Sequence, residues 1–338
     1  MEFKRIAVDT SKAVFTVHGT DERGRPILRE NLTRARFERF LGKVPPTEVV
    51  LEACGSSHHW GRFAQELGHM VRLVPPQYVK PFVKRGKNDR ADAEAISEAA
   101  SRPSMRFVPV RSAEAQAEAM DLSARDLLVR QRTQLVNAIR GHAAEFGVIA
   151  AKGITQIEPL LSKVAADTDM PQAAKDTLAH LGRVVAQLDA QLAEIDRRLA
   201  ARHKANPTSQ RLAAVPGVGP VTALTVATTI DPGQFASARH FAAWLGLTPR
   251  EHSTSGRQRL GGISRAGNER LRQLLAVGAM AVIRQARPGG KAASPWLLAL
   301  LERRPRKLAA VALANKMARI SWAMMANGTA YRRSPQAA

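Results

Sequence analysis

The first hundred residues alternate short β-prone runs with stretches that favour helix, and this alternation constrains the fold more than any other feature. Apolar, β-branched runs bounded by turn residues predict strands, whereas longer stretches with helical periodicity predict helices. The predicted strands are Lys4–Val8, Ala13–Val17, Pro26–Arg29, Glu48–Leu51 and Met70–Val74, and the predicted helices are Thr33–Leu41, His58–Leu67, Tyr78–Lys84 and Asp89–Ala100. This order predicts an α/β domain with an open mixed sheet and helices on its faces.

The rest of the chain is predicted to be mostly helical. Residues 111–146 are almost free of Gly and Pro and predict one long helix, and residues 172–203 predict another. The second helix has apolar residues at the spacing of a coiled-coil seam: Leu178, Leu181, Val185, Leu188, Leu192, Ile195 and Leu199. Such a seam fits either an antiparallel helical hairpin within one chain or a dimerisation arm, and the sequence does not decide between them.

Beyond residue 205 the pattern changes again. A linker-like stretch, Asn206–Ser209, precedes further predicted helices at Asn268–Gln285, Ser294–Glu302 and Arg306–Met325. Residues 250–266 are rich in Gly, Ser and Arg and are predicted to form a loop between helices. We therefore divide the chain into an α/β domain at 1–105, long helices at 106–205 and a mostly helical domain at 206–330.

The formal net charge of +22 indicates a polyanionic partner. Lys and Arg outnumber Asp and Glu by 17 to 13 in residues 1–100, by 15 to 12 in residues 101–207 and by 19 to 4 in residues 208–338. The last third is therefore predicted to be the main nucleic-acid-binding region. The single cysteine, Cys54, excludes an intrachain disulfide framework, and no apolar run has the length of a membrane span. With no signal peptide evident, we expect a cytoplasmic protein, associated with the bacterial nucleoid if it binds DNA.

Four acidic residues form the candidate catalytic site. Asp9 follows one apolar strand, Glu52 ends another, and Asp89 and Asp92 lie three apart on a predicted helix and so share a face. Because strand ends gather at one edge of an open sheet, the four carboxylates can converge there and hold Mg²⁺ or Mn²⁺. Two such ions would suit phosphodiester chemistry. The alternative is structural, since Asp9 can cap a turn and Asp89 can cap its helix.

Several motifs together resemble one family along nearly the whole chain. They are Ala7–Lys12, Leu51–Gly55, Lys87–Ala93, Pro216–Pro220, and Gly246–Ser253 continuing through Gly261–Asn268. In this order they resemble the DEDD-type insertion-sequence transposases, a family related to the pilin gene invertase whose members look like bridge-RNA-guided recombinases. The resemblance implies an N-terminal RuvC-like domain with an RNase H-like fold, in which Asp9, Glu52, Asp89 and Asp92 are the DEDD carboxylates.

The resemblance also implies a serine nucleophile in the C-terminal transposase domain. Ser253 fits best by its spacing to the downstream Ser-Arg-Ala-Gly segment, and Ser255 is the alternative. The serine would attack a DNA phosphodiester and form a phosphoserine link. The arginines around it would grip phosphate oxygens: Arg250, Arg257, Arg259 and Arg265. The implied partners are donor and target DNA, a structured guide RNA and further copies of the chain, as a dimer or tetramer, and a site built from carboxylates and serine could draw on two subunits.

Three other segments are weaker candidates. Gly217 and Gly219 lie in a Pro-Gly-Val-Gly-Pro sequence that fits either a helix-hairpin-helix phosphate contact or a plain turn. A basic cluster that fits either a nucleic-acid contact or a solvated surface comprises Arg303, Arg304, Arg306 and Lys307. The Cys54–His59 segment contains a cysteine and two histidines, which could suggest a Cys–His nucleophilic pair or a zinc site. No third orienting group and no further ligands are evident nearby, so we expect Cys54 to be a small core residue after its strand.

Three functions fit these features. The first is a DNA transposase or site-specific recombinase that cuts and rejoins DNA through a serine. The second is an RNase H-like metal-dependent endonuclease or junction resolvase that uses water as the nucleophile. The third is a basic nucleic-acid scaffold without catalysis.

Overall fold

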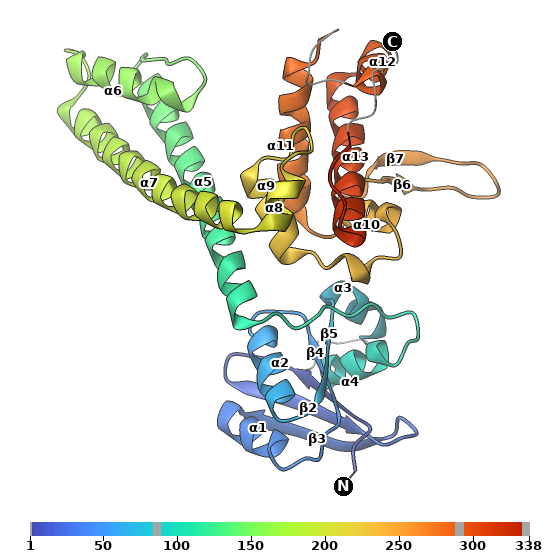
Figure 1. Cartoon of the computed structure of the whole chain (residues 1–338). Helices are drawn as coiled ribbons and strands as arrows, with labels where there is room; N and C mark the ends of the chain where they lie inside the picture. Colours follow the sequence, from blue (N-terminus) through green and yellow to red (C-terminus); the bar gives the residue numbers. More distant parts are fainter. Residues whose placement is uncertain (1, 84–88, 288–293, 333–338) are drawn as a thin grey trace. The chain divides into compact units, whose positions relative to one another are not determined.

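The computed structural model describes residues 2–83, 89–287 and 294–332. Contacts between residues divide the chain into two compact units, Met1–Gln116 and Ala117–Ala338 (Figure 1). The division of the chain at residues 105 and 205 stays a prediction.

The first unit is built on a five-stranded mixed sheet. Its elements are β1 (Arg5–Asp9), β2 (Val14–Thr20), β3 (Pro26–Thr33), α1 (Arg34–Leu41), β4 (Glu48–Glu52), α2 (Ser57–Glu66), β5 (Met70–Val74), α3 (Pro76–Val79), a 3-10 turn (Lys80–Phe82) and α4 (Asp89–Ala100). The strand order is β3-β2-β1-β4-β5. β1, β4 and β5 are parallel neighbours, and β2 and β3 are antiparallel. The predicted open mixed sheet is therefore confirmed.

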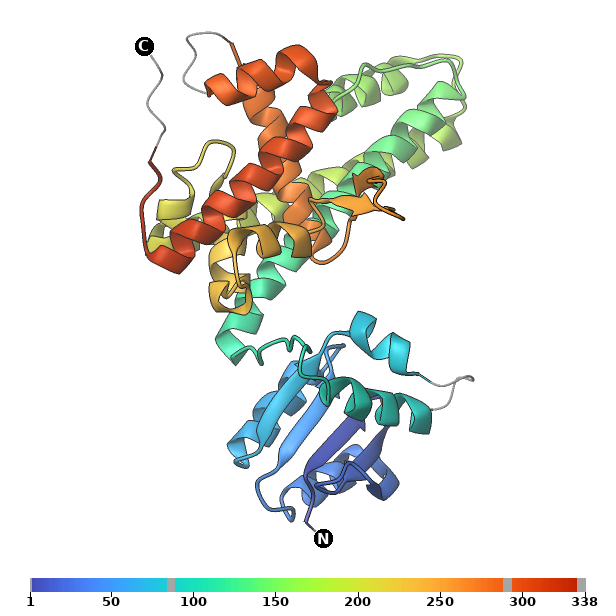
Figure 2. The same cartoon turned by 90° about the vertical axis from the view of Figure 1, so that its right-hand side faces the viewer.

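Helices cover both faces of this sheet (Figure 2). Because side chains alternate along a strand, Val8 of β1 and Leu51 of β4 pack on the side of α1 and α2, in a core that includes Trp60. Ala7 and Val50, one position earlier on the same strands, pack on the opposite side against α4. The same alternation therefore decides toward which face of the sheet the last residues of β1 and β4, Asp9 and Glu52, point.

A buried ion network anchors α4 to the sheet. Arg5 forms an ion pair with Glu48, which also pairs with Arg72 at 2.9 Å. The Arg5 guanidinium also donates from Nη1 to the carbonyl of Ser97 on α4, at 2.9 Å. The Glu48 side chain is only 5% exposed, so removing either arginine would leave a buried charge less well compensated.

In the part of the second unit that the structure describes, helices are joined by a two-stranded sheet. Its elements are α5 (Ala113–Ala144, which begins before the boundary), a 3-10 turn (Ile154–Gln156), α6 (Ile157–Ala166), α7 (Gln172–Ala205), α8 (Pro207–Leu212), α9 (Pro220–Thr229), a 3-10 turn (Pro232–Gln234), α10 (Ala238–Trp244), β6 (Pro249–Glu251), β7 (Leu260–Ile263), α11 (Glu269–Gln285), α12 (Pro295–Arg303) and α13 (Arg306–Asn327). Among the described residues, no helix combines the length and apolarity needed to span a membrane.

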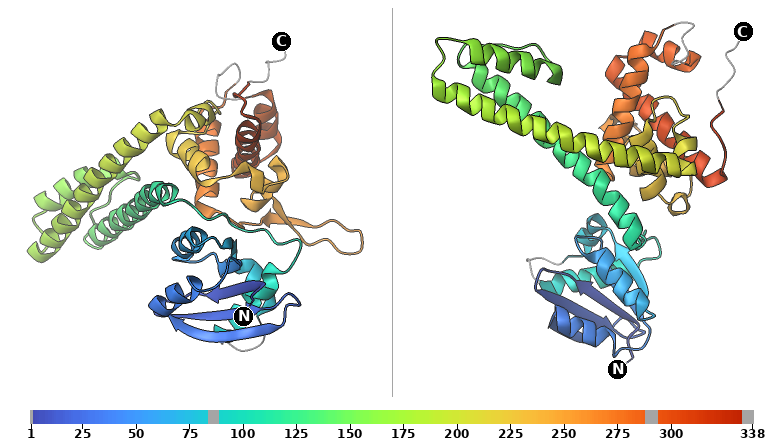
Figure 3. Two further views of the ribbon diagram at one scale, coloured as in Figure 1. Left: turned by 60° about the horizontal axis from the view of Figure 1, so that its bottom comes forward. Right: turned by 60° about the vertical axis from the view of Figure 1, so that its left-hand side comes forward.

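The long helices α5 and α7 run antiparallel (Figure 3). Ion pairs join the two helices. Arg125 pairs with Asp196 at 2.5 Å and Arg132 pairs with Asp189 at 2.6 Å, so positions rise along α5 as they fall along α7. Most of the predicted apolar seam of α7 is buried within the chain, against α5, α6 and α9. This arrangement matches the antiparallel hairpin that the sequence allowed.

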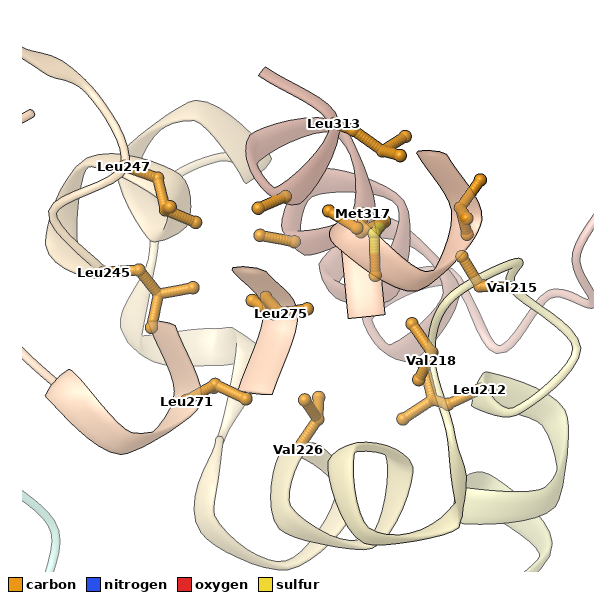
Figure 4. Packing of buried hydrophobic residues seen from close by; sticks show 14 of the residues in the cluster. Leu212, Val215, Val218, Val226, Leu245, Leu247, Leu271, Leu275, Leu313 and Met317 are labelled. Atoms are coloured by element: carbon orange, nitrogen blue, oxygen red, sulfur yellow. The ribbon is translucent and has the colours of Figure 1, made fainter. Parts of the chain in front are cut away.

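A large apolar core holds the C-terminal helices together (Figure 4). It is formed by residues of α8 to α13 and their connections, among them Leu212, Val226, Leu245, Leu275 and Met317. At one side of this core, the turn before α9 packs directly against α11.

Two glycines, Gly217 of the turn and Gly278 of α11, lie in close contact where these segments pack. A Cβ added to Gly217 would lie 2.9 Å from the carbonyl oxygen of Gly278, and one added to Gly278 would lie only 1.9 Å from the carbonyl oxygen of Gly217. Gly217 also has φ of 87°, a conformation that favours glycine. Close helix packing therefore accounts for both glycines.

The segment predicted as a loop at 250–266 contains a β-hairpin, so that prediction was wrong in type. β6 and β7 pair with Glu251 opposite Leu260, and an isolated bridge joins Thr254 to Arg257. The two residues between them, Ser255 and Gly256, have φ of 49° and 77°. Positive φ at both positions of a two-residue turn is typical of a tight type I′ hairpin.

Candidate active site

The ends of β1 and β4 bring two predicted carboxylates together. Val8 pairs with Leu51 in the parallel ladder, and Asp9 and Glu52 are the next residues on these strands. Since Val8 and Leu51 face α1 and α2, alternation turns Asp9 and Glu52 to the face covered by α4. Asp92 lies in the first turn of that helix. The sheet edge therefore gathers carboxylates from three separate parts of the sequence.

The pKa of Glu52 reflects the two other carboxylates at this edge. Burial raises the pKa of Glu52, and repulsion from Asp9 and then Asp92 raises it further. Lys80, in the turn after α3, opposes that rise. Sequence reasoning missed Lys80, because nothing in the sequence indicated that the turn at residues 80–82 would lie near this edge.

The residues at this edge fit a hard divalent cation in their chemistry. Carboxylate oxygens are the ligands that Mg²⁺ and Mn²⁺ prefer, and a cation would relieve the repulsion that raises the pKa of Glu52. Among the described side chains, no three His, Cys, Asp or Glu are arranged closely enough to hold a metal ion. The fourth predicted ligand is Asp89: its backbone begins α4, but its side chain lies outside the described part of the chain.

Cys54 and His58 have structural partners near this edge. The Cys54 thiol is half-buried and lies 3.2 Å from the Thr10 hydroxyl, so it joins the turns that follow β1 and β4. It is therefore less buried than the core residue we expected. His58 accepts a hydrogen bond at Nδ1 from the Arg111 backbone N–H at 3.2 Å. Burial lowers the pKa of His58, and the charges of Arg111 and Arg62 lower it further.

The second group of predicted residues lies on the β6–β7 hairpin, which stands out from the helical body of its unit (Figure 1). Ser253 donates from Oγ to Oε1 of Glu251 at 2.6 Å and accepts from the Arg259 backbone N–H at 3.1 Å. Ser255 occupies the turn itself. The two candidate serines therefore differ in environment: Ser253 has its hydroxyl oriented by two partners, while Ser255 adopts the positive φ that the turn requires.

Sequence reasoning missed Glu251. The available signal was its position two residues before Ser253, since residues i and i+2 of a strand share a face. It was overlooked because the segment was predicted to be a loop.

The predicted phosphate-binding arginines of this segment are exposed. Arg257 and Arg259 lie on the hairpin, and Arg265 follows it with φ of 57°. Arg250 is also exposed, and its guanidinium donates to the Ser264 carbonyl from Nη2 at 3.2 Å. The hairpin therefore presents several guanidinium groups to solvent around Ser253.

Two other predicted nucleic-acid contacts have clear positions. Gly219 is the N-cap of α9, and nothing lies within 4 Å of a Cβ placed there, whereas Gly217 is packed against α11. The basic cluster Arg303, Arg304, Arg306 and Lys307 is exposed where α12 ends and α13 begins. Contact of these residues with nucleic acid stays a prediction.

Comparison with known proteins identifies the family of this chain. Residues 6–147 match the DEDD transposase family model, and residues 209–294 match the transposase model of the IS116/IS110/IS902 family. The chain is 52% identical over 332 residues to a Sinorhizobium fredii protein named as a transposase, covering 98% of this chain and 86% of that protein. It is 40% identical to the transposase for insertion sequence element IS1111A of Coxiella burnetii, covering 98% of this chain and 92% of that protein.

A more distant similarity covers part of the chain. The pilin gene-inverting protein of Moraxella bovis is 26% identical over 214 residues, covering 61% of this chain and 58% of that protein. The two family models match both the segment with the carboxylates and the segment with the serine hairpin, and the relatives align along nearly the whole chain. The chain therefore belongs to the IS116/IS110/IS902 family of DEDD transposases, enzymes that cut and rejoin DNA.

Proposed function

We propose that this transposase cuts and rejoins DNA through Ser253, assisted by a divalent cation held by the carboxylates at the edge of the N-terminal sheet. The observation that carries this proposal is the hydroxyl of Ser253, oriented by two hydrogen bonds on an exposed, arginine-rich hairpin. Nucleophilic attack requires an accessible hydroxyl in a fixed direction, and an exposed hairpin can reach a DNA backbone.

In this proposal the arginines bind and orient the phosphodiester. Arg257 and Arg259 are the first candidates, because their guanidinium groups are exposed on the same hairpin as Ser253. Asp9, Glu52 and Asp92 would hold Mg²⁺ or Mn²⁺, with Asp89 as the fourth ligand. When bound, such a cation supplies positive charge that stabilises the charge developing on the phosphate.

The test is the formation of a covalent protein–DNA adduct on a plasmid that carries the ends of the insertion sequence. We expect Ser253→Ala to abolish the adduct and Ser255→Ala to retain it. Asp9→Ala is expected to lower recombination at least about 100-fold while leaving DNA binding intact. Loss of the adduct in Ser255→Ala alone would reassign the nucleophile to that serine.

The same assay separates this proposal from a metal-dependent endonuclease that uses water. Magnesium-dependent strand cleavage that survives replacement of both serines would support the water mechanism and reject the covalent one. Matched purification of all variants, with melting temperatures measured first, ensures that the absence of an adduct reflects chemistry rather than unfolding.

We further propose that a structured guide RNA supplies target specificity, that the active form is a dimer or tetramer, and that the protein associates with the nucleoid. The resemblance of the whole chain to RNA-guided recombinases and the net charge of +15 in residues 208–338 support the RNA partner. Purification without nuclease should yield a co-bound RNA, and its digestion should abolish site-specific recombination. Light scattering before and after digestion would give the oligomeric state.

A further inference from the structure

We propose that Glu251 is the general base that removes the proton from the Ser253 hydroxyl. This inference rests on the proposed role of Ser253 as the nucleophile. Its geometric basis is the 2.6 Å distance between Ser253 Oγ and Glu251 Oε1, which is a short, charge-assisted hydrogen bond. A general base has to lie within hydrogen-bond reach of the proton that it takes, and Glu251 meets that condition.

The surrounding backbone fixes the direction of this proton transfer. The Arg259 N–H donates to Ser253 Oγ at 3.1 Å, so one lone pair of the hydroxyl is occupied and its own hydrogen points toward Glu251. Glu251 and Ser253 are two positions apart on one side of an extended segment, so the contact follows from strand geometry. The opposing ladder, with Glu251 opposite Leu260, holds that segment extended.

The charge of Glu251 is unusual for its location, and this is a second argument. Residues 208–338 contain only four acidic residues against 19 Lys and Arg. A carboxylate on a hairpin that binds phosphate repels the ligand and weakens binding. A role in the chemistry would explain why the hairpin nevertheless carries one. Two of the other three acids have local structural roles: Asp231 accepts from the Gly233 N–H, and Glu269 accepts from Gln273. The carboxylate of Glu251 instead accepts a hydrogen bond from the hydroxyl of Ser253, the proposed nucleophile.

The proposed step balances in protons and bonds. Ser253 Oγ forms a bond to phosphorus as its proton passes to Glu251, the bond from phosphorus to one deoxyribose oxygen breaks, and that oxygen takes up a proton from the solvent as it leaves. In the rejoining step the deoxyribose hydroxyl attacks the phosphoserine and releases its proton to the solvent, the bond from phosphorus to Ser253 Oγ breaks, and protonated Glu251 returns its proton to that oxygen. One carboxylate therefore serves as base in cleavage and as acid in rejoining.

The test compares Glu251→Gln with the wild-type protein in the rate of adduct formation across a pH series. Gln keeps a hydrogen-bond acceptor for Ser253 but cannot take its proton, so the hairpin should persist while the rate falls about 10²- to 10⁴-fold. The wild-type rate should level off once the base is deprotonated, whereas the residual rate of the variant should keep rising with hydroxide concentration. Glu251→Asp, which restores a carboxylate at a longer reach, should recover part of the rate.

Matched controls separate this role from charge, from stability and from the other groups of the hairpin. Glu269→Gln removes one carboxylate from the same unit and should keep the wild-type rate. The other charged or titratable side chains of the hairpin are Arg250, His252, Arg257 and Arg259. His252→Gln shows whether the histidine contributes to the pH profile, and equal DNA affinity and melting temperature in all variants would show that the fold is intact.

Two results would overturn the proposal. One is a Glu251→Gln rate within about threefold of wild type, because a general base contributes far more than that. The other is a slower rate with a pH profile parallel to that of wild type, since that would make Glu251 a structural partner of the hairpin. An adduct that persists in Ser253→Ala would instead reject the serine assignment itself.

Discussion

Glu52 is one of three carboxylates that the fold holds at one edge of the sheet, and their mutual repulsion adds to burial in raising its pKa. A raised pKa means that the folded chain binds a proton at Glu52 more readily than the unfolded chain does. Without a cation, this residue therefore costs stability when it is ionised, and the stability of the metal-free protein should fall as the pH rises through that pKa.

The first prediction follows from that repulsion. Glu52→Gln should raise the melting temperature of the metal-free protein by a few degrees, because it removes one of the interacting charges. The same change should lower recombination at least about 100-fold. Addition of Mg²⁺ should raise the melting temperature of the wild-type protein more than that of the variant. Glu66→Gln, at the exposed end of α2, is the matched control and should change none of these values.

His58 provides a second prediction at this scale. Folding lowers its pKa, and its Nδ1 accepts a hydrogen bond as a neutral ring. The stability from His58 is therefore present above its unfolded pKa of about 6.5 and is lost as the pH falls through the lower folded value. The melting temperature of His58→Asn, which keeps an acceptor, should depend less on pH in this acid range. His59→Gln should retain the wild-type pH dependence, and the same flattening in both variants would contradict the assignment.

At the scale of elements, the first unit was largely predictable from sequence. Apolar, β-branched runs marked β4 and β5, and the predicted helix at Asp89–Ala100 has the bounds of α4. These elements are read easily because each buries side chains with a regular period. The convergence of Asp9 and Glu52 was predictable for the same reason, since strand ends in an open sheet meet at one edge.

The β6–β7 hairpin could not be predicted in this way. Nearly all of its side chains are exposed, so it has no apolar alternation to recognise. Its shape is set by the turn, where Ser255 and Gly256 have positive φ, and by its backbone ladder. The contact between Glu251 and Ser253 depends on that ladder, which explains why the serine was predicted and its partner was not.

The third prediction concerns the packing of α11 against the turn before α9. Gly278→Ala should lower the free energy of unfolding by about 2 kcal/mol, because the new Cβ would lie 1.9 Å from the Gly217 carbonyl oxygen. This decrease is expected although alanine is favoured over glycine in a helix by about 1 kcal/mol. Gly141→Ala is a control of opposite sign. Gly141 lies in α5, and nothing lies within 4 Å of a Cβ placed there, so this variant should increase the free energy of unfolding by up to about 1 kcal/mol. Denaturant unfolding measures both, and a neutral Gly278→Ala would contradict the close packing.

At the scale of the whole molecule, charge is distributed unequally along the chain. Residues 208–338 carry a net charge of +15, and the exposed cluster at residues 303–307 adds to the arginines of the hairpin. Neutralising Arg303, Arg304, Arg306 and Lys307 together should weaken DNA or RNA binding and make it less dependent on salt. For every phosphate that the variant no longer neutralises, the slope of log affinity against log salt should become shallower by about 0.9 for duplex DNA.

The control for this fourth prediction uses exposed arginines on another element. Arg183 and Arg197 are exposed on α7, outside the most basic third of the chain. Their neutralisation should leave the slope unchanged. An equal decrease of slope in both sets would indicate a diffuse charge effect instead of binding at the 303–307 cluster.

The contact between Cys54 and Thr10 also has a practical consequence. Because the chain has a single cysteine, a thiol-reactive nitroxide would attach at one position only, in the turn directly after β4 and beside the carboxylate edge. Mn²⁺ bound at that edge would broaden the spectrum of the nitroxide, and diamagnetic Mg²⁺ would reverse the broadening by competition. The lone thiol thus offers a spectroscopic readout of cation occupancy that needs no DNA, no RNA and no turnover.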